Sequence, residues 1–256
     1  MKVRLLPSNV SRPIDVQTLT SFIVNDRVVI DGGSIGFALA PNDQIGISHF
    51  VVTHTHADHI ASLPIIIADV YTFLKEPIVI YGVEEVVHDL KLHVFNNKIW
   101  PDFTQIPLPD GSEPTLKFVT VEEGVPFDVD GLQITPIFVN HPVVCTGLLV
   151  YDGEMTLAFT SDTYKTDRFW AEASKMPNLK AVFVDVSFPS TEEPLAERSG
   201  HLTPHSLNEE LPKLSGDPMV YAVHIKPFFR SAVIKELSAL GNPRIEVANI
   251  NREYFF

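Results

Sequence analysis

Cysteine is nearly absent from this chain of 256 residues, because Cys145 is the only one. A single cysteine excludes an internal disulfide, which is typical of proteins from a reducing compartment. The sequence also lacks a run of about 18 apolar residues, the length that a membrane-spanning helix needs. Its first residues lack the apolar core of a signal peptide. These absences predict a soluble, cytoplasmic protein with no membrane partner.

Basic residues are scarce as well. The chain has 19 lysines and arginines against 32 aspartates and glutamates, a formal net charge of −13. The resulting negative field repels a phosphate backbone, so we expect no extended nucleic-acid-binding surface. A local positive centre, such as a metal ion, could still bind a small anionic substrate.

The remaining composition is that of a globular protein, with 45% hydrophobic residues. Short β-rich runs bounded by Gly, Asp, Asn or Pro predict ten strands, within 20–25, 27–33, 47–56, 77–82, 116–121, 132–140, 146–153, 155–162, 180–188 and 219–225. Helical patterns are fewer and cover 58–74, 84–97, 166–175, 203–214 and 230–240. Residues 98–116, rich in Pro and Asp, predict a loop insertion. We therefore predict one α/β domain over residues 1–256.

The strongest local signal for chemistry is the segment from Thr53 to His59, THTHADH, between a strand-like run and an apolar helix. On an extended chain His54 and His56 point to the same side, and Asp58 and His59 then fall at the turn and the helix start. Three imidazoles and one carboxylate within six positions are typical of a site for a borderline cation such as Zn²⁺. The alternative interpretation is a surface cluster of polar residues, which seldom has four ligand-type side chains at this spacing.

The HxHxDH pattern resembles that of the metallo-β-lactamase superfamily, and later motifs of that superfamily occur here in order. Asp31 follows the run RVVI and matches an aspartate that orients the metal-binding loop. His141, Asp162 and His224 match the third, fourth and last motifs, and each follows a strand-like run. The resemblance implies a four-layer αββα sandwich with a dinuclear metal site at the edge of two mixed β-sheets.

The resemblance also implies seven metal ligands, all imidazoles or carboxylates: His54, His56, Asp58, His59, His141, Asp162 and His224. One metal would be held by His54, His56 and His141. The other would be held by Asp58, His59 and His224, with Asp162 between the two. Two divalent cations are thus expected, with Zn²⁺ favoured and Mn²⁺ or iron as alternatives. Such a centre lowers the pKa of bound water towards about 7 and supplies hydroxide, and Asp58 is expected to take part in catalysis.

Two further segments indicate a substrate. Residues 200–204, GHLTP, with the preceding SFP, and residues 93–101, HVFNNKIWP, resemble segments of the class II 3′,5′-cyclic-nucleotide phosphodiesterases. At the start of a helix, where free N–H groups favour an anion, His201 would contact the phosphoryl oxygen or protonate the leaving 3′-oxygen. A capping or core histidine is the alternative. Trp100 and Phe103 could form an apolar wall for a purine, with core or dimer packing as the alternative.

The resemblance therefore implies a metal-dependent phosphodiesterase that hydrolyses cyclic AMP or cyclic GMP, a small anionic substrate, to the 5′-nucleotide. An RNA 3′-processing endonuclease of the same superfamily is the first alternative, but the chain has no basic, Gly-rich insertion. A lactonase, thioesterase or β-lactamase would leave the two segments above unexplained. A non-catalytic binding module would normally show eroded ligands. The superfamily also makes a homodimer an expectation, with 98–116 as the candidate contact.

Overall fold

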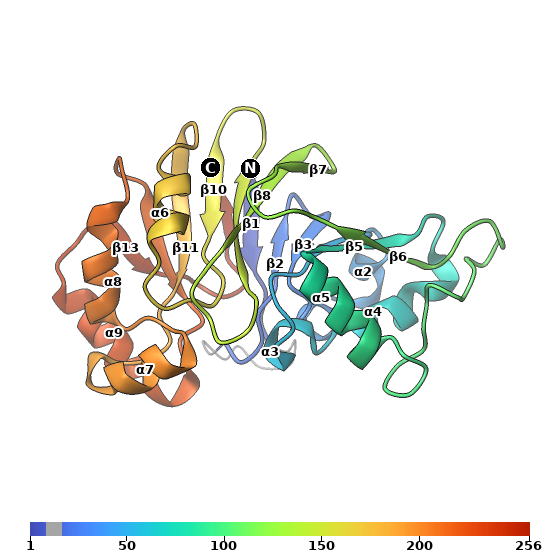
Figure 1. The fold of residues 1–256 in the computed structure, drawn as a ribbon, viewed down its shortest axis with the longest axis horizontal. Coiled ribbons are helices and arrows are strands. Elements are labelled where there is room, and N and C mark those ends of the chain that lie inside the picture. The colour runs from blue at the N-terminus through green and yellow to red at the C-terminus, as the bar shows by residue number, and fades with distance from the viewer. Residues whose placement is uncertain (9–16) are drawn as a thin grey trace. The chain divides into compact units, whose positions relative to one another are not determined.

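The computed structural model describes residues 1–8 and 17–256, which form two compact units, each built on a seven-stranded sheet (Figure 1). The first unit comprises residues 1–8, 19–122 and 250–255, and the second comprises 17–18, 123–249 and 256. That residues 1–256 form one domain stays a prediction.

The sheet of the first unit has the strand order β14-β1-β2-β3-β4-β5-β6. Its strands are β1 (Lys2–Leu5), β2 (Phe22–Val24), β3 (Val28–Ile30), β4 (His49–Val51), β5 (Ile78–Gly82), β6 (Leu116–Thr120) and β14 (Glu253–Phe255). Pairing is antiparallel from β14 to β3 and parallel from β3 to β6. The carboxyl ends of β3 and β4 therefore meet at one edge, where ligand-binding residues of such sheets gather.

The sheet of the second unit has the order β13-β12-β11-β10-β9-β8-β7. Its strands are β7 (Phe127–Val129), β8 (Leu132–Phe138), β9 (Thr146–Tyr151), β10 (Thr156–Phe159), β11 (Leu179–Asp185), β12 (Met219–Val223) and β13 (Ile245–Val247). Pairing is parallel from β13 to β10 and antiparallel from β10 to β7. Because β8 and β10 both run antiparallel to β9, β8 ends at the same edge as β10, β11 and β12.

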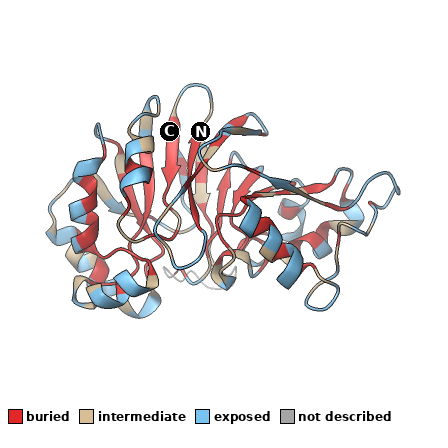
Figure 2. Cartoon of the chain, viewed as in Figure 1, coloured by how far each residue is buried: buried red, intermediate tan, exposed pale blue. Residues whose placement is uncertain are grey.

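Short helices accompany each sheet. The first unit has α1 (Ile35–Ala38), α2 (Pro41–Gln44), α3 (Ala57–Ile60), α4 (Leu63–Val70) and α5 (Glu84–Asp89), and the second has α6 (Asp167–Ala173), α7 (Glu193–Ser199), α8 (Pro204–Glu210) and α9 (Arg230–Ala239). Helix α5 packs on β5 and β6, α6 on β8, and α9 on β13. Figure 2 shows strands that are mostly buried and helices with one exposed side. Within the described part of the chain, no helix is long and apolar enough to cross a bilayer.

All ten predicted strands are present, because apolar runs between turn residues report local structure directly. The prediction of one continuous helix over 58–74 was wrong, because this segment is divided into α3, α4 and a 3-10 turn at Tyr71–Phe73. The break lies at Ser62, whose hydroxyl donates to Gly32 O and accepts from Gly36 N, both at 2.9 Å. Pro64 is the second residue of α4, within the first turn, where a backbone N–H has no partner inside the helix. The loop insertion predicted over 98–116 has no helix and reaches β6 only at its end.

Candidate metal centre

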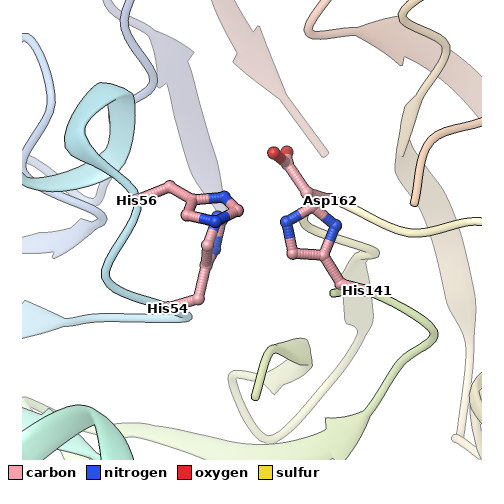
Figure 3. Close-up of side chains that lie close together, drawn as sticks. All are labelled: His54, His56, His141 and Asp162. Atoms are coloured by element: carbon pink, nitrogen blue, oxygen red, sulfur yellow. The ribbon is translucent and has the colours of Figure 1, made fainter. Parts of the chain in front are cut away.

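The first group of candidate ligands lies in the first unit, directly after β4. His54 and His59 are buried, and their ring centroids are 4.1 Å apart. The rings of His54 and His56 are 4.8 Å apart (Figure 3). His56 occupies the N-cap position of α3, so that Asp58 falls in the first turn of that helix. This strand-to-helix transition brings three imidazoles together, as the spacing of the motif predicted.

Asp31 directly follows β3, has a positive φ and contacts two residues of this histidine segment. Its Oδ2 lies 2.7 Å from His59 Nδ1, and its Oδ1 accepts from the Thr53 backbone N–H at 2.8 Å. The contact with His59 favours a proton on Nδ1, which leaves the lone pair on Nε2 for another partner. A ligand histidine whose second nitrogen is held by a carboxylate is usual at metal sites. Asp31 thus has the geometry that its predicted orienting role requires.

Glycine at position 33 allows the backbone after β3 to pack directly on the histidine segment. A Cβ atom at Gly33 would lie 2.0 Å from Asp58 O and 2.7 Å from Thr20 O. The segments are also joined by backbone hydrogen bonds from Thr20 N to Asp58 O (2.8 Å) and from Gly32 N to His59 O (2.6 Å). The start of α3 is therefore held in place by main-chain contacts.

The second group of candidate ligands lies in the second unit, at the carboxyl ends of its parallel strands. Candidate donor atoms of four buried side chains lie within 4.8 Å of one another, and these are Asp162, Asp185, His201 and His224. Asp162 follows β10, Asp185 ends β11 and His224 follows β12. Figure 3 shows Asp162 together with His141, which follows β8. The ends of four strands thus meet at one sheet edge. Three of them are followed by a predicted ligand, and β11 ends in Asp185, which lies beside these ligands.

Asp185 and Ser187 connect this group and were not singled out from the sequence. Asp185 Oδ2 lies 2.7 Å from His201 Nδ1, and Ser187 Oγ donates to Asp185 Oδ1 at 2.7 Å. Ser187 Oγ also lies 3.0 Å from His224 Nδ1. Burial raises the pKa of Asp185, but the charge and hydrogen bond of His201 and a hydrogen bond from His224 outweigh it, so the pKa lies below its ordinary value. The available signal was that Asp185, like Asp162, ends a strand-like run.

His141 is oriented by the residue that precedes His201. Its Nδ1 lies 3.0 Å from Gly200 O, which leaves Nε2 as the ligand nitrogen. Gly200 ends α7 with φ +71°, and His201 N then donates to Ala196 O at 2.9 Å. Thr203 and Ser206 form a capping box at the start of α8. His201 is thus fixed between a helix end and a helix start, as its sequence context indicated.

Replacing Gly200 with alanine is expected to disturb this arrangement. The new Cβ would lie 2.7 Å from His141 Nδ1, and the positive φ strains any residue with a side chain. We expect the free energy of unfolding to fall by about 1–3 kcal/mol and zinc affinity to fall with it, measured by urea denaturation and metal titration. Gly216→Ala is the matched control, because it has φ +76° but only Pro218 at 4.0 Å. Equal zinc affinity in the two variants would contradict this role of Gly200.

Three residues at or beside the two groups have left-handed backbone conformations without being glycine. Asp31 and His224 have φ of 60°, and Ser161, which precedes Asp162, has φ of 54°. Such conformations cost about 1–3 kcal/mol each and are often found at functional sites, where surrounding structure enforces them. The backbone at these strand ends is therefore determined by tertiary contacts rather than by local preference.

Trp100 and Phe103 lie in the first unit, in the loop after α5. Asn97 Oδ1 accepts from Asp102 N at 2.9 Å, and Trp100 pairs with Phe95 in an isolated bridge. Phe103 is only 6% exposed, and its ring centroid is 6.3 Å from that of Tyr71. The HVFNNKIWP segment thus has a structural role in shaping the loop. That Trp100 and Phe103 contact a substrate stays a prediction.

The donors in both groups suit a divalent metal. They are imidazole nitrogens and carboxylate oxygens, a combination that binds Zn²⁺, Mn²⁺ and iron. Several of the histidines have one ring nitrogen held by an oxygen atom, including His59 by Asp31 and His141 by Gly200. The residues present therefore fit the metal ions that the sequence motif implied.

Comparison with known proteins agrees with this chemistry. The family model of the class-II cAMP phosphodiesterases matches residues 42–141. The chain is 28% identical over 193 residues to 3′,5′-cyclic-nucleotide phosphodiesterase 1 of Saccharomyces cerevisiae, covering 66% of this chain and 51% of the relative. It is 26% identical over 234 residues to a probable 3′,5′-cyclic-nucleotide phosphodiesterase of Yersinia pestis, covering 78% and 65%. The matched regions thus span less than two thirds of these relatives.

Solved structures show the fold. Unliganded yeast PDE1 matches with a TM-score of 0.82 at 19% identity, over 100% of this chain and 99% of that one. The metallo-β-lactamase fold protein YhfI from Bacillus subtilis matches with a TM-score of 0.73 at 16% identity, over 99% and 98%. The predicted α/β class is therefore confirmed. The chain has the metallo-β-lactamase fold, and its resemblance to the class-II cyclic-nucleotide phosphodiesterases is confirmed by the family match over residues 42–141.

Proposed function

We propose that this protein is a metal-dependent phosphodiesterase that hydrolyses 3′,5′-cyclic nucleotides to 5′-nucleotides. The observation that carries the proposal is the match to the class-II cAMP phosphodiesterases, because residues 42–141 include the whole first ligand group as well as His141. The names of the two curated relatives reported above, both cyclic-nucleotide phosphodiesterases, support the same substrate class.

The proposal includes two divalent cations, with Zn²⁺ favoured. The residues that would hold them are the seven predicted ligands, namely His54, His56, Asp58, His59, His141, Asp162 and His224. When bound, such a pair of cations supplies Lewis acidity towards phosphoryl oxygens and lowers the pKa of a water molecule enough for attack at neutral pH. Asp58, in the first turn of α3, is proposed to take part in catalysis besides holding a cation.

His201 is proposed to act on the leaving group. Its Nδ1 is engaged by Asp185 at 2.7 Å, so Nε2 is the nitrogen that remains to give a proton to the 3′-oxygen or to contact a phosphoryl oxygen. The buried Asp185 carboxylate orients the imidazole through this contact, and Ser187 donates a hydrogen bond to the other oxygen of the same carboxylate. Asp185 and Ser187 are thus positioning residues for His201.

Three further parts of the proposal concern the rest of the chain. Trp100 and Phe103 are proposed as an apolar wall for the base, residues 1–256 as one domain, and residues 98–116 as a contact in a homodimer.

The proposal is tested by incubating Zn²⁺- and Mn²⁺-loaded protein with cyclic AMP and cyclic GMP and separating the products by chromatography. We expect 5′-nucleotide from at least one of them, and its loss after treatment with a chelator. Formation of the 3′-nucleotide would contradict the role given to His201. Cleavage of bis(p-nitrophenyl) phosphate without turnover of either cyclic nucleotide would overturn the substrate class and favour the linear phosphodiesters of an RNA-processing enzyme.

A further inference from the structure

Lys226 brings a positive charge to the second ligand group, two residues beyond His224. Its Nζ lies 3.4 Å from His224 Nε2, and the side chain is half-buried. The main chain of Lys226 is fixed, because its N–H donates to Ser187 O at 3.1 Å and its carbonyl accepts from Phe229 N at 2.9 Å. The backbone of Lys226 is therefore held by hydrogen bonds, one of them to Ser187, which also contacts Asp185.

The position of this ammonium group beside Nε2 matters because Nε2 is the nitrogen that remains for a ligand role. The other ring nitrogen, Nδ1, faces Ser187 Oγ at 3.0 Å. If Nε2 held a divalent cation, that cation and the nearby lysine ammonium would repel each other. A bound anion would offset this repulsion, because it would be attracted by both positive charges. The placement of Lys226 thus favours an anionic ligand at this point.

Aromatic side chains adjoin this group of residues. Phe188 lies with its ring centroid 5.7 Å from that of His201 and 5.6 Å from that of Phe229. These rings thus connect His201 with the turn Pro227–Phe229 that follows Lys226. Because the chain has a net charge of −13, binding of an anion needs a local positive charge such as that of Lys226.

We propose that Lys226 binds a phosphoryl oxygen of the substrate, and the phosphate of the 5′-nucleotide product, beside His224. This inference rests on the proposed function for the identity of the nucleotide, but phosphate recognition by Lys226 is tested separately from turnover. Under the competing interpretation, the ammonium bonds only the imidazole and moves into solvent when the imidazole binds a cation.

The test measures binding of orthophosphate, 5′-AMP and adenosine to Zn²⁺-loaded protein by isothermal titration calorimetry. Lys226→Met should weaken binding of orthophosphate and 5′-AMP about 10- to 100-fold, the usual worth of a hydrogen bond to a charged group. Its affinity for adenosine, which has no phosphate, should be unchanged. Lys226→Arg should retain most of the affinity, because it keeps the charge. Zinc content, measured by mass spectrometry, should equal that of wild type in both variants.

Lys235→Met is the matched control, since Lys235 is exposed on α9 and its loss changes the net charge equally. Lys226→Gln provides a polar variant if Lys226→Met does not fold. Unchanged phosphate affinity in Lys226→Met or Lys226→Gln, an equal loss in Lys235→Met, or no phosphate binding by wild type would overturn the inference. If no cyclic nucleotide is hydrolysed but Lys226→Met still loses phosphate affinity, the proposed function fails and the inference stands.

Discussion

Replacing Asp162 with alanine is expected to remove metal and nearly all phosphodiesterase activity. Asp162 is only 2% exposed, and its carboxylate oxygens lie 3.5 Å from His224 Nδ1 and 4.0 Å from His201 Nδ1. As the proposed ligand of both cations, it contributes a negative charge to the binding of each. Replacing a residue that only supports a metal ligand lowers metal affinity or activity about 10–100-fold. Replacing Asp162 should therefore lower kcat/KM for cyclic AMP by more than about 100-fold.

The measurement pairs turnover with metal content after dialysis, determined by mass spectrometry. Wild type should keep about two equivalents per chain under the dinuclear proposal, and Asp162→Ala at most one. Asp162→Asn, which keeps the shape of the side chain, separates loss of charge from loss of packing. Asp217→Ala is the control, because that carboxylate is 91% exposed and pairs with Arg244. Full metal content and activity in Asp162→Ala would exclude a bridging role.

Replacing His201 with alanine is expected to reduce kcat for cyclic AMP by about 10²–10⁴-fold, the range for loss of a general acid or base. The metal content should stay at the wild-type level, because His201 is not among the proposed ligands. The loss should be much smaller for bis(p-nitrophenyl) phosphate, whose leaving group departs as a stable anion without a proton. A mere phosphate contact would instead impair both substrates equally.

The same experiment tests how Asp185 acts. If Asp185 only orients His201, through the 2.7 Å contact with Nδ1, then Asp185→Asn should cause no further loss in a chain that already lacks the imidazole. The double variant should therefore be as slow as His201→Ala alone. If the fold-loss of kcat in the double variant equals the product of the two single losses, Asp185 acts independently of His201. His205→Ala is the control, since that side chain is 61% exposed and faces Glu209 at the surface.

Much of the candidate site could be predicted because its residues are arranged locally. The histidine and aspartate residues from 54 to 59 occupy one strand end and the first turn of one helix, so their spacing alone orients them. The same holds for the strands, whose apolar runs end at turn residues. His201 could be placed near a helix start because Thr203 and Pro204 are strong local signals for one.

Other features depend on contacts between distant parts of the chain. Strand β14 pairs with β1, joining residues about 250 positions apart, and is too short and exposed to be recognised alone. Helix 58–74 was predicted as continuous because only the tertiary structure shows that Ser62 bonds the backbone after β3. The left-handed conformations of Asp31 and His224 likewise oppose local preference.

The sequence by itself therefore determined the kind of chemistry that we propose, since a metal motif needs only suitable donors at a fixed spacing on one strand end. Tertiary structure decided which side chains support that chemistry. Asp185, Ser187 and Lys226 come near His201 and His224 because β11 and β12 are parallel neighbours and end at one sheet edge. Strand order depends on which distant strands form hydrogen bonds with each other, and the apolar pattern of one segment does not identify its neighbour.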